Sequence, residues 1–532
     1  MKKWVVTLLK TIAFLAVCYG ALLGIVYFML AIPTERELWR ISEYRVSNPI
    51  LVNDLLIFHG YKVDHSVDCY CTYAVDKSTG EIVWSTEELA TAYIEEAKGL
   101  GVGSADSTSV RAWVETVSPT TDVIYISINY WGSDHTRYNS ILALKSSNGE
   151  LLWKVDGEAV SDSIAGSVAE ISRIFVVDNQ GDLLAIDSDT GKEIWHQKVH
   201  EQHEWGENWF TYKNSAIYIS THSSECLISH CAFALDEQHY QQITAFSAET
   251  GELLWESPRL YRGRIYVFDN MMYMVSDPWD NSPEVKQRDD KLVTAIDLGT
   301  GSQKWELTFE NAHEFYIFAD DNKEIYVMFK SYRGGPNNFS KLAKLIVIDE
   351  LSGNIVWQFN EDFSHGDLGH LKSGDTVYLG TEDGFIYALE SSTGSIAWST
   401  ESGHFPYEFV VNRDTLIAVY EERFVSALDS TTGEQKWMLD LGIEDGWYYF
   451  NDEILKINGN DIYIAGNADE KIYALDLETG SILWSWKHFY PFKSEFQITF
   501  IENNLLYVNH QSDFRNLIDL NEKNWFFALK IK

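Results

Sequence analysis

Short apolar runs, each followed by a tight polar turn, recur along most of the chain. Phe385–Leu389 and Lys471–Leu475 are clear examples. Their apolar side chains fall on both alternating sets of positions, the pattern of an inner strand covered on both faces. Helical periodicity is absent apart from the N-terminal segment and one short stretch. The pattern therefore predicts a chain of antiparallel strands.

An eleven-residue phrase closes these runs, and its clearest copy is Ala474–Trp484, ALDLETGSILW. Asp can hydrogen-bond the backbone two residues on, Gly supplies a positive φ, and Trp follows Gly by four residues in an outer strand. The spacing between tryptophans runs from 39 residues (Trp398 to Trp437) to 69 (Trp84 to Trp153). The Gly and Trp pairs of the nine copies are Gly80/Trp84, Gly149/Trp153, Gly191/Trp195, Gly251/Trp255, Gly301/Trp305, Gly353/Trp357, Gly394/Trp398, Gly433/Trp437 and Gly480/Trp484.

A second turn signal precedes several copies, so each unit indicates about four antiparallel strands, one blade of a β-propeller. The ends of the chain complement each other. Phe526–Lys530 matches the first half of the phrase, and Glu37–Trp39 matches the missing second half. A blade built from both termini would close the ring and remove an exposed sheet edge. We predict an all-β fold, a single propeller of eight to ten four-stranded blades with a literal count of ten.

The phrase A-x-D-x-x-T-G-x-x-x-W resembles the tryptophan-docking motif of quinoprotein-like (PQQ-repeat) β-propellers, from about Leu38 to the C-terminus. That superfamily includes PQQ-dependent alcohol dehydrogenases and non-catalytic outer-membrane assembly lipoproteins of the BamB type, usually with eight blades. Its catalytic members hold the quinone with Ca²⁺, and many carry a vicinal Cys-Cys disulfide. This chain has no adjacent cysteines, and no Glu/Asn/Asp metal set matches the family's. We therefore predict no catalytic residue, no metal and no cofactor, with PQQ and Ca²⁺ as the alternative.

The carboxylates within the repeats are explained by turn formation rather than by catalysis. They are Asp76, Asp187, Asp297, Asp349, Asp429 and Asp476.

The first residues predict membrane attachment. Residues 11–32 form an uncharged run long enough to span a bilayer as a helix. Lys2, Lys3 and Lys10 precede it, which favours a cytoplasmic segment 1–10, a signal anchor 11–32 and a propeller 33–532 in the periplasm or outside the cell. The alternative is lipidation of Cys18, against which Val17 argues because it is bulky.

Charge and cysteines narrow the partners and the compartment. The chain carries 41 basic and 79 acidic residues, a net charge of −38, which argues against nucleic acid and against broad attachment to anionic lipids. Outside the cytoplasm, Cys226 and Cys231 could form a loop-closing disulfide. Cys69 and Cys71 are free or paired elsewhere, since a bridge between them would be strained.

Three insertions depart from the repeat. Ser85–Gly99 predicts a short helix with Ser85 as N-cap, Glu88 completing a capping box, and Leu89, Ala92 and Tyr93 on one side; it packs on the rim or docks a partner. A stretch rich in histidine predicts a surface loop, and a zinc site is the alternative. Trp279 lies in a turn-rich connection and either packs on the rim or binds a partner. The histidines of the second insertion are His196, His200, His203, His222, His230 and His239.

These observations favour a non-catalytic, membrane-anchored propeller that binds envelope proteins as a scaffold. The alternatives are a periplasmic PQQ-dependent dehydrogenase with a diverged site and a propeller that senses a small ligand.

Overall fold

The computed structural model describes most of the repeat region. The described residues are 36–41, 44–46, 49–62, 69–92, 110–117, 122–131, 137–157, 164–168, 172–177, 182–199, 210–223, 240–257, 264–276, 291–310, 312–319, 323–333, 340–359, 368–420, 424–441, 455–466, 471–487, 494–512 and 524–531. The predicted anchor 11–32 lies outside them. Among the residues described, we find no helix long and apolar enough to cross a membrane.

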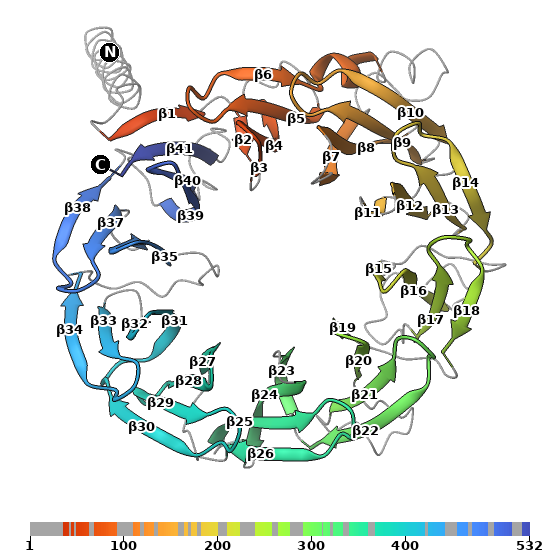
Figure 1. Ribbon diagram of the computed structural model, residues 1–532. Coiled ribbons are helices and arrows are strands. Elements are labelled where there is room, and N and C mark those ends of the chain that lie inside the picture. Colours follow the sequence, from red (N-terminus) through yellow and green to blue (C-terminus); the bar gives the residue numbers. More distant parts are fainter. Residues whose placement is uncertain are drawn as a thin grey trace, which may run out of the picture.

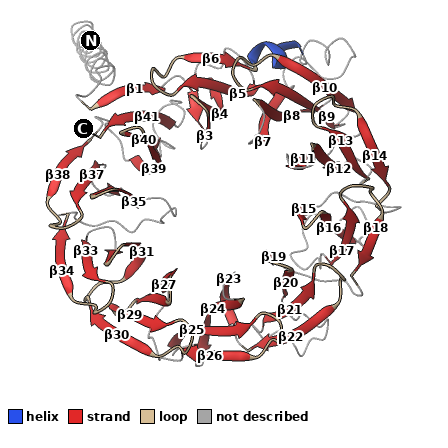
Figure 2. Ribbon diagram, viewed as in Figure 1, coloured by secondary structure: helices blue, strands red, loops and turns tan. Residues whose placement is uncertain are grey.

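The described strands form a ring of ten antiparallel blades, which confirms the literal motif count (Figures 1 and 2). In each blade the strand that carries the repeat Trp is outermost, and the strand order runs from the centre of the ring outward. The apolar runs of the sequence form the third strand of each blade, as their two-sided apolar pattern requires.

Blades 1 to 5 comprise the strands from β2 to β22. Their bounds are β2 (Tyr44–Val46), β3 (Ile50–Val52), β4 (Leu55–Lys62), β5 (Cys69–Asp76) and β6 (Ile82–Ser85) in blade 1; β7 (Val110–Val117), β8 (Val123–Trp131), β9 (Arg137–Lys145) and β10 (Leu151–Gly157) in blade 2; β11 (Ile164–Val168), β12 (Arg173–Val177), β13 (Leu183–Asp187) and β14 (Glu193–Gln197) in blade 3; β15 (Phe210–Lys213), β16 (Ala216–Ser223), β17 (Tyr240–Ser247) and β18 (Leu253–Glu256) in blade 4; and β19 (Arg264–Phe268), β20 (Met271–Ser276), β21 (Lys291–Asp297) and β22 (Gln303–Phe309) in blade 5.

Blades 6 to 10 comprise the remaining strands. Their bounds are β23 (Ala312–Ala319), β24 (Glu324–Arg333), β25 (Ser340–Asp349) and β26 (Ile355–Phe359) in blade 6; β27 (Leu368–Ser373), β28 (Thr376–Thr381), β29 (Phe385–Glu390) and β30 (Ile396–Glu401) in blade 7; β31 (Pro406–Asn412), β32 (Thr415–Tyr420), β33 (Phe424–Asp429) and β34 (Gln435–Asp440) in blade 8; β35 (Leu455–Asn458), β36 (Asp461–Gly466), β37 (Lys471–Asp476) and β38 (Ile482–Trp486) in blade 9; and β39 (Ser494–Glu502), β40 (Leu505–Ser512), β41 (Asn524–Lys530) and β1 (Glu37–Ile41) in blade 10.

Blade 10 contains both ends of the described chain. β1 pairs antiparallel with β41, and Trp39 lies opposite Ala528. The two half-phrases seen in the sequence thus share one blade, so neither leaves an open sheet edge at the closure.

Blade 1 is the least regular blade. Its inner position is shared by β2 and β3, which both pair with β4. β5 also pairs in parallel with β7 at Cys69 and Tyr70, so blades 1 and 2 belong to one sheet.

The hydrophobic core lies between blades rather than at one centre. One cluster joins Trp39, Phe526 and Tyr507 of blade 10 to blades 1 and 2. Another joins blades 5 and 6 through Tyr273 and Trp305. Each blade therefore depends on its two neighbours for burial of its apolar faces, as in other repeat architectures.

Candidate functional site

The turns of the repeat are held by local hydrogen bonds to aspartate. In blade 1 the carbonyl of Asp76 accepts the Gly80 N–H at 2.8 Å. Its carboxylate accepts the backbone N–H groups of Ser78 and Thr79 at 2.8 and 2.9 Å. The Ser78 hydroxyl also donates to this carboxylate, and these bonds keep the pKa of Asp76 below its usual value.

The same arrangement recurs along the ring. Hydroxyls of Thr190, Ser352 and Thr479 bond the corresponding aspartates and lower their pKa values. These carboxylates are therefore engaged in building turns.

Every repeat Trp except Trp484 packs on the Gly turn of the next blade. A Cβ added to Gly80, at φ +72°, would lie 2.6 Å from the Trp39 ring. Eight of the tryptophans also donate their indole N–H to a backbone carbonyl in the turn of the next blade. That carbonyl belongs to the residue directly after the first residue of the turn, and the N···O distances are 2.6 to 3.0 Å. These bonds run from Trp39 to Lys77, Trp84 to Ser146, Trp153 to Ser188, Trp255 to Leu298, Trp305 to Glu350, Trp357 to Ser391, Trp398 to Ser430 and Trp437 to Leu477.

The junction between blades 3 and 4 departs from this rule. Trp195 still lies against Gly251, but its buried indole nitrogen has no hydrogen-bond partner among the described residues. The carbonyl of Ala248, the equivalent acceptor, is bonded by the Arg173 guanidinium at 2.7 Å. In four other blades a Tyr hydroxyl gives this carbonyl a second bond, as Tyr218 does at 3.1 Å, whereas blade 3 has Phe175 at that strand position.

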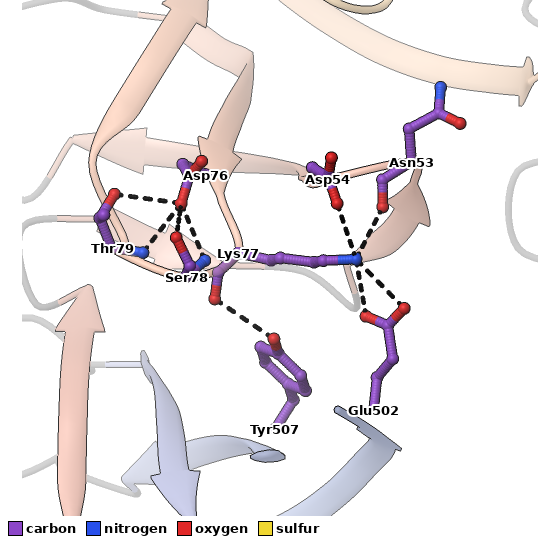
Figure 3. A network of polar contacts seen from close by, with 8 residues as sticks. All are labelled: Asn53, Asp54, Asp76, Lys77, Ser78, Thr79, Glu502 and Tyr507. Carbon is purple, nitrogen blue, oxygen red and sulfur yellow. Dashed lines mark hydrogen bonds and ion pairs between the residues drawn. The ribbon is translucent and has the colours of Figure 1, made fainter. Parts of the chain in front are cut away.

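The closure between blades 10 and 1 carries additional polar contacts (Figure 3). The Lys77 ammonium lies 3.1 Å from Asp54, 3.1 Å from Glu502 and 3.0 Å from the Asn53 carbonyl. Tyr507 donates to the Lys77 carbonyl at 3.2 Å, the same oxygen that accepts from Trp39. Burial by itself would lower the pKa of Lys77, but the carboxylates of Glu502 and Asp54 outweigh this effect and raise it.

Arg36 replaces the missing Gly turn of blade 10. Its guanidinium lies 4.4 Å from the centre of the Trp484 ring, and it donates to the carbonyls of Lys530 and Ile531 at 3.2 and 3.3 Å. A cation over an indole face is attractive. Arg36 thus completes the packing of blade 9 on blade 10, a role that sequence reasoning missed because the phrase is interrupted there.

The outer rim exposes apolar residues at the two positions before the repeat Trp. Ile82, Val83, Leu151, Leu152, Ile194, Leu253, Leu254, Ile355, Val356, Ile396, Ile482 and Leu483 are 41–52% exposed, and Leu38 is 38% exposed. Blades 5 and 8 carry Gln303–Lys304 and Gln435–Lys436 there instead. A bulge in each outer strand, for example between Ile82 and Trp84, interrupts pairing at these positions.

The helical insertion begins one residue later than predicted. The helix spans 87–92, and the Thr86 carbonyl accepts the Ala90 N–H at 2.9 Å, so Thr86 rather than Ser85 is the N-cap. Thr86 also accepts the Thr72 N–H, which ties the start of the helix to β5. Ala90, not Ala92, is the buried alanine, because the one-residue shift rotates the face that meets blade 1. Tyr93–Gly99 lies outside the described residues.

The other predicted candidates are only partly described. Cys71 is buried and disulfide-bonded. His196 lies in β14, 3.5 Å from the Asp182 carboxylate, and His222 lies in β16. Cys226, Cys231, Trp279, Cys18, His200, His203, His230 and His239 lie outside the described residues.

The part of the chain that the structure describes contains no group of three or more His, Cys, Asp or Glu side chains placed to hold a metal ion. The sequence also lacks the vicinal cysteines expected beside the quinone from the resemblance.

Two curated relatives are quinone-dependent enzymes. The dehydrogenase subunit of the quinone alcohol dehydrogenase of Gluconobacter oxydans (strain 621H) is 22% identical over 301 residues, 49% of this chain and 36% of the relative. The quinohemoprotein alcohol dehydrogenase of Comamonas testosteroni is 23% identical over 281 residues, 50% of this chain and 35% of the relative. The chain thus spans about a third of the length of the curated relatives it matches.

The crystal structure of BamB from Moraxella catarrhalis is 13% identical, with a TM-score of 0.33 over 72% of this chain and 96% of that one. A family model described as outer membrane protein assembly factor BamB matches residues 137–205, 231–316 and 343–513, more than half of the chain. On that match the chain belongs to this family of PQQ-repeat β-propellers.

Proposed function

We propose that this chain is a non-catalytic, membrane-tethered scaffold, with its propeller outside the cytoplasm, that binds other proteins of the cell envelope. The proposal rests on one observation: the polar side chains of the repeat are engaged in hydrogen bonds that build the ring. Turn carboxylates such as Asp76 accept hydrogen bonds from their own turns, and eight indoles bond the next blade. These groups hold the ring together and are not available for catalysis.

Three further observations support the location and the role. Residues 11–32 form a 22-residue uncharged run with lysines before it. Cys71 is disulfide-bonded, as is common outside the cytoplasm and rare within it. A ring of ten blades also offers a broad surface for protein partners.

The tether is tested by fractionation. The full chain should stay with the membrane after carbonate extraction. A variant in which residues 1–32 are replaced by a cleavable secretion signal should appear in the soluble extracytoplasmic fraction. Release of the full chain by carbonate would contradict the tether.

The scaffold role is tested by in-cell cross-linking of the full chain. A specific envelope protein should be cross-linked to the full chain, and the same propeller expressed without its N-terminal segment in the cytoplasm should not capture it. Equal capture from both compartments, or recovery of no envelope protein, would contradict the scaffold.

The second candidate is a quinone-dependent dehydrogenase, which the matches to two quinone alcohol dehydrogenases favour. Purified full chain supplied with PQQ and Ca²⁺ should not reduce an artificial electron acceptor in the presence of alcohols. Alcohol-dependent reduction that requires PQQ would replace the scaffold with the enzyme.

A further inference from the structure

The chain joins the ring at its outer rim. Arg36 is the first described residue and leads directly into β1, the outermost strand of blade 10 (Figure 1). Its N–H groups bond two carbonyls at the end of the chain, and its guanidinium lies over Trp484. The point where the N-terminal segment meets the ring is therefore fixed.

Only three residues separate the apolar run from this point. Ile32 and Arg36 are four residues apart, which bridges at most about 14 Å even when fully extended. If residues 11–32 cross a membrane, as the proposed function holds, blade 10 must lie next to the lipid surface.

Two surfaces of the ring meet at Arg36, and their chemistry differs. The face that carries the repeat turns presents carboxylates close to the closure, among them Asp54, Asp476 and Glu478. Of the two lysines near the closure, Lys77 is ion-paired with Asp54 and Glu502, and Lys530 at the end of β41 is exposed. The carboxylates of this face are repelled by anionic head groups, and they would lose favourable hydration at any lipid surface.

The rim beside Arg36 is apolar instead. Ile482 and Leu483 of blade 9 are each 49% exposed, and Ile82 and Val83 of blade 1 are 44% and 47% exposed. β1, which carries Leu38, lies between β38 and β6 (Figure 1). Moving such side chains from water into the head-group boundary is favourable because it removes apolar surface from water.

We infer that the ring stands edge-on to the membrane, with the rim of blades 9, 10 and 1 resting in the lipid interface. The inference rests on the proposed tether. The apolar pairs of blades 4 and 6 stay in water because they lie on far parts of the ring, and blade 5, opposite blade 10 in Figure 1, carries Gln303–Lys304 at the same positions. Both faces of the ring stay accessible to protein partners.

Site-specific photo-cross-linking to lipid tests the orientation. Val83→benzoylphenylalanine and Leu483→benzoylphenylalanine variants of the full chain are reconstituted in phosphatidylcholine vesicles, irradiated and analysed for phospholipid adducts. Leu254→benzoylphenylalanine is the matched control, because Leu254 has the same outer-strand position and 52% exposure on a distant blade. Lys304→benzoylphenylalanine is the control opposite the tether.

The inference expects lipid adducts at positions 83 and 483, several-fold above those at 254 and 304. Equal adducts at all four positions, or adducts only at 254, would overturn the edge-on orientation. Cross-links from 83 and 483 to another copy or to another protein, without lipid, would also overturn it. A full chain that does not stay in the vesicles would refute the tether itself, whereas a retained chain without lipid adducts at 83 and 483 would refute the orientation alone.

Discussion

The closure between blades 10 and 1 and the junction between blades 3 and 4 use the same motif with different reinforcement. At the closure the Lys77 carbonyl accepts from Trp39 and Tyr507, and the Lys77 ammonium joins both blades through Asp54 and Glu502. At the other junction the indole of Trp195 has no acceptor among the described residues, and Phe175 provides no hydroxyl.

The difference follows from chain connectivity. Blades 3 and 4 are joined by the chain itself, so their separation costs additional backbone strain. β1 and blade 1 come from one end of the sequence and β39–β41 from the other, so only non-covalent contacts hold these two parts together. Reinforcement therefore belongs where the ring would open first, because loop closure over the whole chain has the largest entropy cost.

The largest expected effect comes from crowding a Gly turn at the closure. Gly80→Ala should lower the free energy of unfolding by about 2–4 kcal/mol, since the new Cβ meets the Trp39 ring at 2.6 Å and φ is +72°. The control is Gly374→Ala, where φ is +55° but nothing lies within 4 Å; it should cost about 1 kcal/mol. Denaturant midpoints measure both, and equal losses would show that the Trp contact is unimportant.

Acid should weaken the closure blades in particular. Burial lowers the pKa of His59 in blade 1 to about 4 and that of His510 in blade 10 to about 3. Their unfolded pKa is near 6.5, so stability is complete above pH 6.5 and falls below it as the unfolded chain takes up protons that the folded chain does not. Each histidine should contribute up to about 1.4 kcal/mol per pH unit.

Thermal midpoints between pH 8 and pH 5 measure this slope. His510→Gln should reduce the slope as well as the midpoint, because Gln does not titrate in this range. His370→Gln is the control, since His370 is exposed on β27. A slope unchanged by His510→Gln would show that burial of this imidazole does not control acid stability.

The indole N–H of a repeat Trp should contribute to stability only where it donates a hydrogen bond to an acceptor. Trp255→Phe removes a 2.8 Å bond to the Leu298 carbonyl, whereas Trp195→Phe removes an N–H that bonds nothing described. Both lose similar volume, so Trp255→Phe should cost about 1 kcal/mol more. Thermal or denaturant unfolding measures the pair. Equal losses for the two variants would mean that the two junctions are equally well bonded.

The smallest expected effect is removal of the ion pairs at the closure. Lys77→Met should lower stability by about 1 kcal/mol or less, because Asp54 is largely exposed and salt screens the attraction. Lys436→Met, which breaks contacts within blade 8 only, should cost less. If 1 M salt fails to narrow the difference between the two variants, electrostatics is not its origin.

Local contacts and contacts between distant residues differ in how well the sequence predicts them. The Asp76, Thr79 and Gly80 turn is built from bonds spanning two to four residues, so its geometry is readable from the phrase itself. The shift of the helix cap from Ser85 to Thr86 shows the limit of such reading, because Thr86 is selected by its bond to Thr72 on β5.

The sequence alone determined the strands, the turns, the ten repeats and the complementary halves that share blade 10. The strands, turns and repeats follow from periodicity and from hydrogen bonds between near neighbours, and the shared blade follows from the two complementary half-phrases. The tertiary structure decided which junctions are reinforced. Lys77 and Glu502 are 425 residues apart, and Arg36 meets Trp484 only once the ring has closed. Contacts at such separations depend on the folded geometry, and no local pattern in the chain encodes them.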